Sequence, residues 1–340
     1  MEVIRNFTEI PPYHSRIYDE YFGGLNTCIM DIETSGLYPN SSRIILGGLL
    51  LPRDKGFEVV QYFADKEKDE ADKGKGERDL LEAYGNALSA CDVFITYNGG
   101  GFDLPFLKQR FMRNGLRFNL DLMQSFDLYR ALRYYSKMRE ILPNLKQKTI
   151  ETFLGLSPHR EDGISGRESV VLYEQYLRSG SSAAREKVLL HNRDDLVQLA
   201  SVLKILNKLD LHRILFHEGF TVAMQDKRIY VKSLSIGQKA LTITGRTRNV
   251  NLDYYSFETG YQAIHKAGEK EMVLTIPFEK RHGATFIDLE SIAADFKPLE
   301  QYPSYESGYL ILKEKGNTNY AEINKTAKII LGQILGTVML

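Results

Sequence analysis

The chain has 340 residues, of which 43% are hydrophobic and 26% charged, and its 44 basic side chains balance 44 acidic ones. These proportions are typical of a globular protein with one large or two ordinary domains, and they exclude fibrous and intrinsically disordered classes. A formal net charge of zero argues against a protein that coats nucleic acid by bulk attraction, while leaving room for a local basic groove that an acidic site offsets.

The first half of the chain alternates strand-like and helical segments. Apolar runs rich in β-branched and aromatic residues predict five strands, at 26–30, 43–51, 57–63, 93–96 and 119–128. Helical patterns occur at 80–88 and 102–111, and helices dominate from 129 to about 209, the last of them long and amphipathic over 184–208. This order predicts an α/β fold with a mixed five-stranded sheet flanked by helices.

After residue 209 the pattern changes to alternating apolar and polar residues separated by turn signals. Strands are predicted at 228–234, 240–247, 271–277, 284–289 and 308–312, followed by a closing helix at 320–335. This half is expected to be a second, smaller α+β domain rich in antiparallel strands. The expected division is therefore an N-terminal extension (1–24), an α/β domain (25–208) and a β-rich domain (209–340).

Cysteine content and hydropathy indicate in which cellular compartment the protein is expected. The only two cysteines, Cys28 and Cys91, lie in apolar runs and are interpreted as buried free thiols, so a disulfide framework is excluded. The first residues lack the apolar stretch of a signal peptide, and no apolar run reaches the length that spans a membrane. We therefore expect a cytoplasmic protein with no membrane partner.

The first motif with chemical meaning is the run from Asp31 to Gly36, DIETSG, at the end of a predicted strand. Residues two apart on a strand project to the same face, so the carboxylates of Asp31 and Glu33 point the same way. Two like charges side by side are costly unless a cation lies between them, and hard divalent ions such as Mg²⁺ or Mn²⁺ prefer oxygen ligands. The alternative is an ordinary acidic pair on an exposed strand face.

The second motif is the run from Tyr97 to Asp103, YNGGGFD. Its glycines permit a sharp strand-to-helix turn or a close approach of the backbone to a ligand. Asp103 is expected at the start of the next helix, where a carboxylate can also serve only as a helix cap. Asn98 is interpreted either as a turn former or as a polar contact to substrate.

The third motif, HNRDD, runs from His191 to Asp195 within the long predicted helix. His191 and Asp195 are four residues apart and therefore share one helical face. Histidine titrates near neutrality, so beside a metal it can take a proton from water. Asp194 is expected to point away as a solvated charge. Taken alone, such a His–Asp pair is more often a surface contact than a site.

In this order, the motifs Asp-x-Glu, Asn-x-x-x-Phe-Asp and His-x-x-x-Asp resemble the DEDD superfamily of ribonuclease H-like 3′→5′ exonucleases. More narrowly they resemble the YprB-type ribonuclease H-like domain, over about residues 25 to 206. Further matching segments are Leu145-Lys146 before Thr149–Leu156, Gly163–Glu168, Tyr173–Leu177 and His191–Leu199. His191 departs from the histidine-type pattern, because it stands four residues before the last Asp, the spacing at which tyrosine-type members place Tyr.

The resemblance implies hydrolysis of phosphodiester bonds at the 3′ end of a nucleic acid, expected to be single-stranded, with two divalent cations, Mg²⁺ or Mn²⁺. Asp31 would bridge both ions, Glu33 and Asp195 would hold the ion that carries the attacking water, and Asp103 would act on the other. His191 would orient and deprotonate the water. The substrate contacts expected around these residues are Thr34, Gly36, Leu37, Asn98, Phe102 and Lys146.

Charge distribution in one segment favours a nucleic acid partner. Between residues 103 and 148 ten Lys or Arg stand against four acidic residues. Aromatic residues interleave with them: Phe111, Phe118, Tyr129, Tyr134 and Tyr135. Cations that meet phosphates, next to rings on which bases stack, are typical of a single-strand path. The alternative is a solvated helix face whose aromatic residues belong to the core.

Two other functions remain as alternatives to a 3′→5′ exonuclease. One is a catalytically silent module that binds nucleic acid without cutting it, and the other is an endonuclease of related fold. The presence of all four carboxylates argues against the silent module, because loss of catalysis usually leaves at least one of them replaced.

Overall fold

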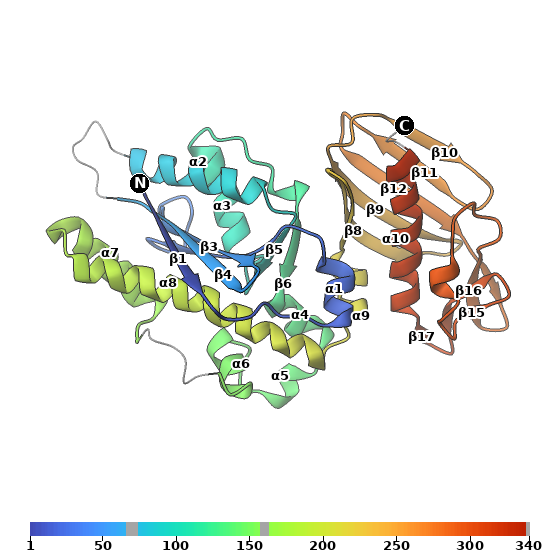
Figure 1. Ribbon diagram of the computed structural model, residues 1–340, viewed down its shortest axis with the longest axis horizontal. Helices are drawn as coiled ribbons and strands as arrows, with labels where there is room; N and C mark the ends of the chain where they lie inside the picture. The colour runs from blue at the N-terminus through green and yellow to red at the C-terminus, as the bar shows by residue number, and fades with distance from the viewer. Residues whose placement is uncertain (66–73, 157–162, 338–340) are drawn as a thin grey trace. The chain divides into compact units, whose positions relative to one another are not determined.

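The computed structural model describes residues 1–65, 74–156 and 163–337 (Figure 1). The chain forms two compact units, Met1–Leu209 and Asp210–Leu340. Among the described residues, none of the helices combines the length and the apolar character needed to cross a bilayer.

The first unit is built on a six-stranded mixed sheet with the order β1-β4-β3-β2-β5-β6. From β1 to β2 the neighbours pair antiparallel, whereas β2, β5 and β6 pair parallel. The carboxyl ends of these three parallel strands therefore meet at one edge of the sheet, where the three motifs converge. The strands are β1 Glu2–Thr8, β2 Thr27–Thr34, β3 Ile44–Arg53, β4 Gly56–Phe63, β5 Val93–Thr96 and β6 Gln124–Asp127.

The sheet has one strand more than the five predicted. The sixth, β1, comes from the segment expected as an extension and pairs with β4 from Glu2 opposite Phe63 to Thr8 opposite Phe57. Its apolar residues Val3 and Phe7 are exposed, so the strand lacks the buried face that makes strands recognisable. The last predicted strand is also shorter than 119–128, because Leu120–Leu122 forms a 3₁₀ turn before β6 begins.

Helices cover both faces of this sheet (Figure 1). On one face lie α2 (Lys75–Ser89) and α3 (Asp103–Arg113), and across the other runs α8 (Ser182–Val202), which packs on β2, β3 and β4. The remaining helices of the unit are α1 Arg16–Phe22, α4 Leu128–Tyr135, α5 Met138–Ile141, α6 Gln147–Phe153 and α7 Gly166–Ser179.

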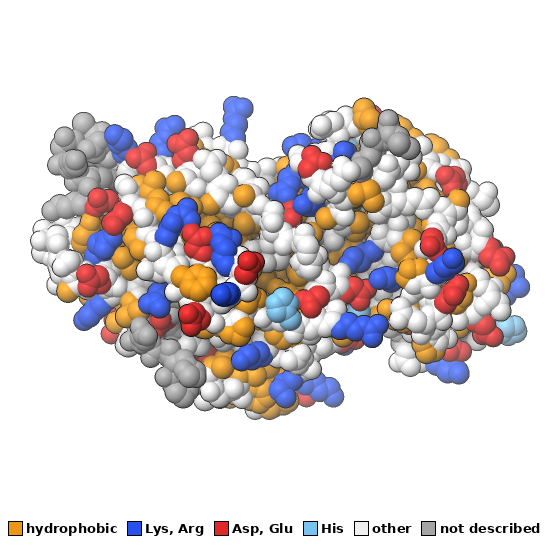
Figure 2. All heavy atoms as spheres, in the orientation of Figure 1, with side chains coloured by type: hydrophobic (Ala, Val, Ile, Leu, Met, Phe, Trp, Pro, Cys, Tyr) orange, Lys and Arg blue, Asp and Glu red, His pale blue; other side chains and the backbone are white. Residues whose placement is uncertain are grey.

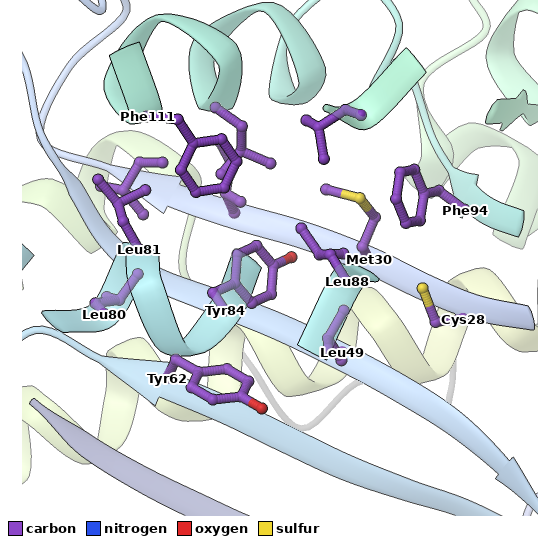
Figure 3. Close-up of a cluster of buried hydrophobic side chains, with 14 of the residues drawn as sticks. Cys28, Met30, Leu49, Tyr62, Leu80, Leu81, Tyr84, Leu88, Phe94 and Phe111 are labelled. Carbon is purple, nitrogen blue, oxygen red and sulfur yellow. The ribbon is translucent and has the colours of Figure 1, made fainter. Parts of the chain in front are cut away.

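A large hydrophobic core fills the space between the sheet and the helices α2 and α3. In Figure 3 the ring of Tyr84, from α2, lies among Met30 and Phe94 from the sheet and Phe111 from α3. Phe111 is buried here, and its ring centroid lies 4.9 Å from that of Phe118, which is partly buried against the same core. The prediction that these rings lie along a single-strand path is therefore wrong for Phe111, whose ring belongs to the core as in the alternative interpretation. Both cysteines are buried and free, as predicted.

Helix α8 differs from the amphipathic helix predicted over 184–208. It ends at Val202, and a 3₁₀ helix, Leu203–Lys208, continues the chain. The sheet packs on one side of α8 while α6 and α7 pack on others, so little of the helix faces solvent. Asp194 is only 6% exposed, and the prediction that it is a solvated charge is wrong for this reason.

The second unit is an α+β arrangement dominated by antiparallel strands, as predicted. Its larger sheet has the order β10-β11-β12-β9-β8-β7, and α10 (Tyr320–Thr337) crosses one face of it (Figure 1). A smaller sheet contains β13, β14, β15, β16 and β17. The other elements are α9 Leu211–Glu218, β7 Thr221–Met224, β8 Lys227–Ile236, β9 Ala240–Arg248, β10 Tyr254–Phe257, β11 Gln262–Lys266, β12 Glu271–Pro277, β13 Glu279–Arg281, β14 Ala284–Asp288, β15 Tyr305–Glu306, β16 Tyr309–Glu314 and β17 Asn317–Thr318.

Candidate active site

Strand β2 carries the first two acidic residues. Asp31 and Glu33 lie opposite Gly48 and Leu46 of β3, and a register shift follows directly after Glu33. Buried apolar residues at 28–30 and at 32 hold the strand in the sheet, so the alternation of side chains turns both carboxylates toward α8. Glu33 is 7% exposed, which means that its charge is removed from bulk water.

Helix α8 supplies the third motif. The Nε2 atom of His191 lies 3.8 Å from Oε1 of Glu33 and 3.7 Å from Oδ2 of Asp195. Within the described part of the chain, these three residues form a group whose ligand atoms all lie within 4.8 Å of one another. The imidazole thus faces the acidic residues despite its unusual spacing from the last Asp, and it is buried.

Asp103 reaches the same place from the first residue of α3. Its Oδ1 accepts the backbone N–H of Ile32 at 3.2 Å, so this carboxylate is tied to β2 between the two acidic residues of that strand. The cap residue of α3 is Phe102, which makes no side-chain cap bond. Asp103 therefore joins the cluster instead of serving only its own helix, although it lies outside the tight group of three ligand atoms.

A turn held by Asp127 sets the start of α3. Asp127, at the end of β6, accepts the backbone N–H groups of Asn98 at 2.8 Å and Gly100 at 3.0 Å, and it also caps α4. Asn98 has a left-handed φ of 66°, which favours a turn former. Sequence reasoning missed Asp127, whose only local signal is a carboxylate placed just before a helical pattern.

Asn192 is the second residue that sequence reasoning missed. Its Nδ2 donates to Oδ2 of Asp31 at 2.9 Å, and the side chain is completely buried. In the sequence it stands between the two candidate residues of α8 with nothing to mark it, because its partner is 161 positions away.

Burial and mutual repulsion raise the pKa values of three of the acidic residues, Asp31, Glu33 and Asp103. Desolvation raises the pKa of Glu33 to about 7 and that of Asp103 to about 7. For Asp31, desolvation and then the charges of Asp103, Glu33 and Asp195 raise the pKa well above its usual range, against a small lowering by the Asn192 bond. Such a cluster of buried oxygens fits divalent cations, because bound positive charge removes the cost of keeping the carboxylates ionised.

The free energy of unfolding of the metal-free protein should fall as pH rises from about 4.5 to about 7. The sign follows from Glu33: its folded pKa of about 7 exceeds the value of 4.5 for an unperturbed Glu, so the folded state holds the proton more tightly and loses stability as that proton leaves. Thermal unfolding in EDTA across this window measures the effect. The Glu33→Gln variant should show a shallower fall, and an equally steep fall in that variant would contradict the assignment.

The predicted substrate contacts occupy different settings. Thr34 is buried and donates to the carbonyl of Gly36 at 2.8 Å, whereas Leu37 is 74% exposed. Asn98 and Lys146 are exposed, and Phe102 is half-buried with its ring centroid 5.5 Å from that of Phe106. The structure therefore brings the four acidic residues and His191 together, while the predicted substrate contacts range from buried Thr34 to exposed Leu37.

The loop after β2 is anchored on α3. Arg110 donates to the carbonyl of Pro39 at 2.9 Å, and both Gln109 and Arg113 bond to Asn40. Leu37 and its neighbour Tyr38, each 74% exposed, lie in this anchored loop. Hydrogen bonds from α3 therefore hold the loop that carries this exposed apolar pair.

A family model described as the RNase H superfamily matches residues 28–207, more than half of the chain. The family B DNA polymerase of the hyperthermophilic archaeon Pyrobaculum calidifontis is 18% identical with a TM-score of 0.42, over 54% of this chain and 24% of that one. A product-bound exonuclease I is 10% identical with a TM-score of 0.36, over 67% and 59%. The chain spans less than two thirds of either protein, and no curated protein matches it.

Proposed function

Because the chain belongs to the RNase H superfamily, we propose that it is a metal-dependent exonuclease that removes nucleotides from the 3′ end of a nucleic acid. The observation that carries this proposal is the group formed by buried Glu33 and His191 with partly exposed Asp195, completed by Asp31 and Asp103 at the carboxyl edge of the sheet. Buried carboxylates of raised pKa beside an imidazole are costly for folding, so a functional reason for them is favoured.

The metal roles are proposed for the four carboxylates. Asp31, Glu33, Asp103 and Asp195 would hold two divalent cations, Mg²⁺ or Mn²⁺. Bound there, such ions stabilise the attacking and the leaving oxygens of an in-line displacement at phosphorus.

His191 is proposed to take a proton from the attacking water at Nε2. Oε1 of Glu33 and Oδ2 of Asp195 lie 3.8 Å and 3.7 Å from this atom, which places the imidazole beside carboxylates that would hold the metal. Burial of the ring also keeps bulk water from replacing the single water to be activated.

The loop after β2 supports binding of a strand end. Leu37 and Tyr38 offer apolar surface to a terminal base, and the bonds from α3 hold the loop in place before the substrate arrives. A contact surface that is fixed in advance loses less conformational entropy on binding.

The exposed side chains of helix α4 support the proposal that the substrate is single-stranded. Arg130, Arg133 and Tyr134 are spaced as one face of α4, Lys137 follows just after the helix, and all four are exposed. The guanidinium of Arg133 lies 5.4 Å from the ring centroid of Tyr134. Around α5, just beyond this helix, Figure 2 shows Lys and Arg side chains beside hydrophobic ones. Cations and exposed rings of this kind bind phosphates and stacked bases.

This face also leads toward the acidic residues. The Cδ atom of Arg130 lies 3.5 Å from the position of a Cβ on Gly100, in the turn that delivers Asp103. A single-stranded nucleic acid bound along α4 would thus approach the acidic residues at the turn between β5 and α3. Phe111 is buried and does not contribute to this face, so only part of the predicted path is supported.

The experiment that tests the function uses a single strand labelled at its 5′ end, with Mn²⁺ or with EDTA. We expect a ladder that shortens one nucleotide at a time from the 3′ end, with mononucleotide products and complete loss in EDTA. Cleavage of a circular single strand would instead indicate an endonuclease. Binding without any cleavage in Mn²⁺ would support the silent module and contradict the proposal.

The role of α4 is tested by titrating the same strand in EDTA at several salt concentrations. Each lost phosphate contact lowers the slope of log affinity against log salt by about 0.7 for a single strand, so we expect that change for Arg133→Ala. The control is Arg178→Ala, an exposed arginine of α7 that pairs with Glu174. If log affinity falls with log salt equally steeply in wild type and Arg133→Ala, the proposal that Arg133 of α4 contacts the substrate is wrong.

A further inference from the structure

Three residues form a row across the sheet beneath α8. Asp31 of β2 lies opposite Gly48 of β3, and Gly48 lies opposite Gln61 of β4. Residues directly opposite one another in a sheet project to the same face. The row therefore presents a carboxylate, an empty position and an amide to the helix above it.

Asn192 of α8 fills the gap in this row. Its Nδ2 donates to Oδ2 of Asp31 at 2.9 Å, and its Oδ1 accepts from Nε2 of Gln61 at 3.0 Å. Gln61 is held in turn, because the same nitrogen donates to the carbonyl of Leu189 at 2.8 Å. Both amides are buried, at 0% and 1% exposure, so water does not compete for these bonds.

The direction of the donors in this chain is fixed by chemistry. An ionised carboxylate only accepts hydrogen bonds, so the amino group of Asn192 must face Asp31. The carbonyl oxygen of Asn192 then faces Gln61, which must present its own amino group. Both donors point toward the carboxylate, an arrangement in which each bond polarises the next.

Gly48 provides the room for Asn192. A Cβ at this position would lie 2.2 Å from Oδ1 of Asn192 and 2.8 Å from Cδ1 of Leu196. The φ of Gly48 is not in the left-handed region, so the need for glycine comes from space and not from backbone conformation. Its neighbour Gly47 makes room for the ring of Tyr84 on the opposite face.

We propose that Asn192 is a positioning residue that fixes the orientation of the Asp31 carboxylate for metal binding. Gln61 holds Asn192 in place by a hydrogen bond, and Gly48 leaves the space that its side chain occupies. This inference rests on the proposed function, because it takes Asp31 to be a metal ligand. Asp31 stands among three other acidic residues that repel it. The bridge holds one of its oxygens and prevents the carboxylate from rotating away from them.

The test is calorimetric titration of the full chain with Mn²⁺ alone, below the melting temperature of every variant. Residues that hydrogen-bond a metal ligand typically contribute 10–100-fold in affinity or activity, so we expect Mn²⁺ to bind about 10–100-fold more weakly to Asn192→Ser. Serine keeps a polar group but is too short to span from Gln61 to Asp31. Gly48→Ala should weaken binding by displacing the same amide.

Two further variants separate positioning from folding. Gln198→Leu removes another buried amide of α8 and should leave Mn²⁺ affinity unchanged. Gln61→Leu should weaken affinity although Gln61 does not contact Asp31, and combining it with Asn192→Ser should add little, because both act through one bridge. Full additivity of the two changes in binding free energy would overturn the bridge.

The outcome for the bridge is separable from the outcome for the function. If wild type cleaves nucleic acid but all variants bind Mn²⁺ equally, the bridge is wrong and the proposed function stands. If Mn²⁺ binding weakens as expected but wild type trims no strand, the exonuclease proposal fails and the positioning role remains.

Discussion

Asp31→Asn is expected to abolish trimming of a single strand while making the metal-free protein more stable. A bound cation contributes several kcal/mol of charge stabilisation in the transition state, and each 1.36 kcal/mol is tenfold in rate, so the loss should be on the order of 10³-fold or more. Stability should rise because the substitution removes a poorly solvated charge that Asp103, Glu33 and Asp195 repel. Opposite changes in activity and stability identify a residue selected for function.

Both effects are measurable on the same preparation. Initial rates of trimming in Mn²⁺ give the activity, and thermal unfolding in EDTA at pH 8 gives the stability. The control is Asp121→Asn, which neutralises an exposed carboxylate paired with Lys108 and should leave trimming unchanged. Full residual activity of Asp31→Asn would refute the metal role of this residue.

Arg110→Ala is expected to destabilise the protein by about 3–5 kcal/mol, the usual cost of breaking a buried ion pair from one side. The side chains of Arg110 and Glu77 are 11% and 3% exposed, and two bonds of 2.8 Å and 2.5 Å join them. Glu77 also accepts the backbone N–H of Ile44 at the start of β3. Without Arg110 the buried Glu77 carboxylate would lose two charged hydrogen bonds and keep the one from Ile44.

The same substitution should weaken substrate binding, because Arg110 also holds the carbonyl of Pro39 in the loop that presents Leu37. Urea denaturation measures the loss of stability, and the Michaelis constant for a single strand measures the loss of binding. Arg117→Ala, an exposed arginine in the segment after α3, should change stability by no more than about 0.5 kcal/mol. A similarly small change for Arg110→Ala would show that this pair contributes little.

Most of the fold of the first unit could be predicted from local patterns. The strands β2 to β5 and helices α2 and α3 follow from hydrophobic periodicity, and the RNase H-like architecture expected from the ordered motifs is confirmed by the family match. The narrower YprB-type resemblance stays a prediction. Two of the errors share one cause: Phe111 and Asp194 have the local setting of surface residues, but packing against segments distant in the chain buries them.

Some residues of the candidate site could likewise be predicted from the sequence, and others could not. The four carboxylates and His191 could be found because each motif has a recognisable spacing, and their roles stay a proposal. Asp127, Gln61 and Asn192 could not, because their meaning lies in partners far along the chain. Asn192 bonds to residues 161 and 131 positions away, and no pattern within one element encodes such a contact.

The pairing of β1 with β4 has a practical consequence for anyone who wishes to produce the first unit alone. A boundary drawn at residue 25 would remove β1 and leave the whole of β4 as a free edge, with a row of backbone donors and acceptors open to other chains. Such a fragment would be prone to self-association, and nuclease assays on it would report on aggregates. A fragment intended for solution work should therefore keep the residues from Glu2 onward.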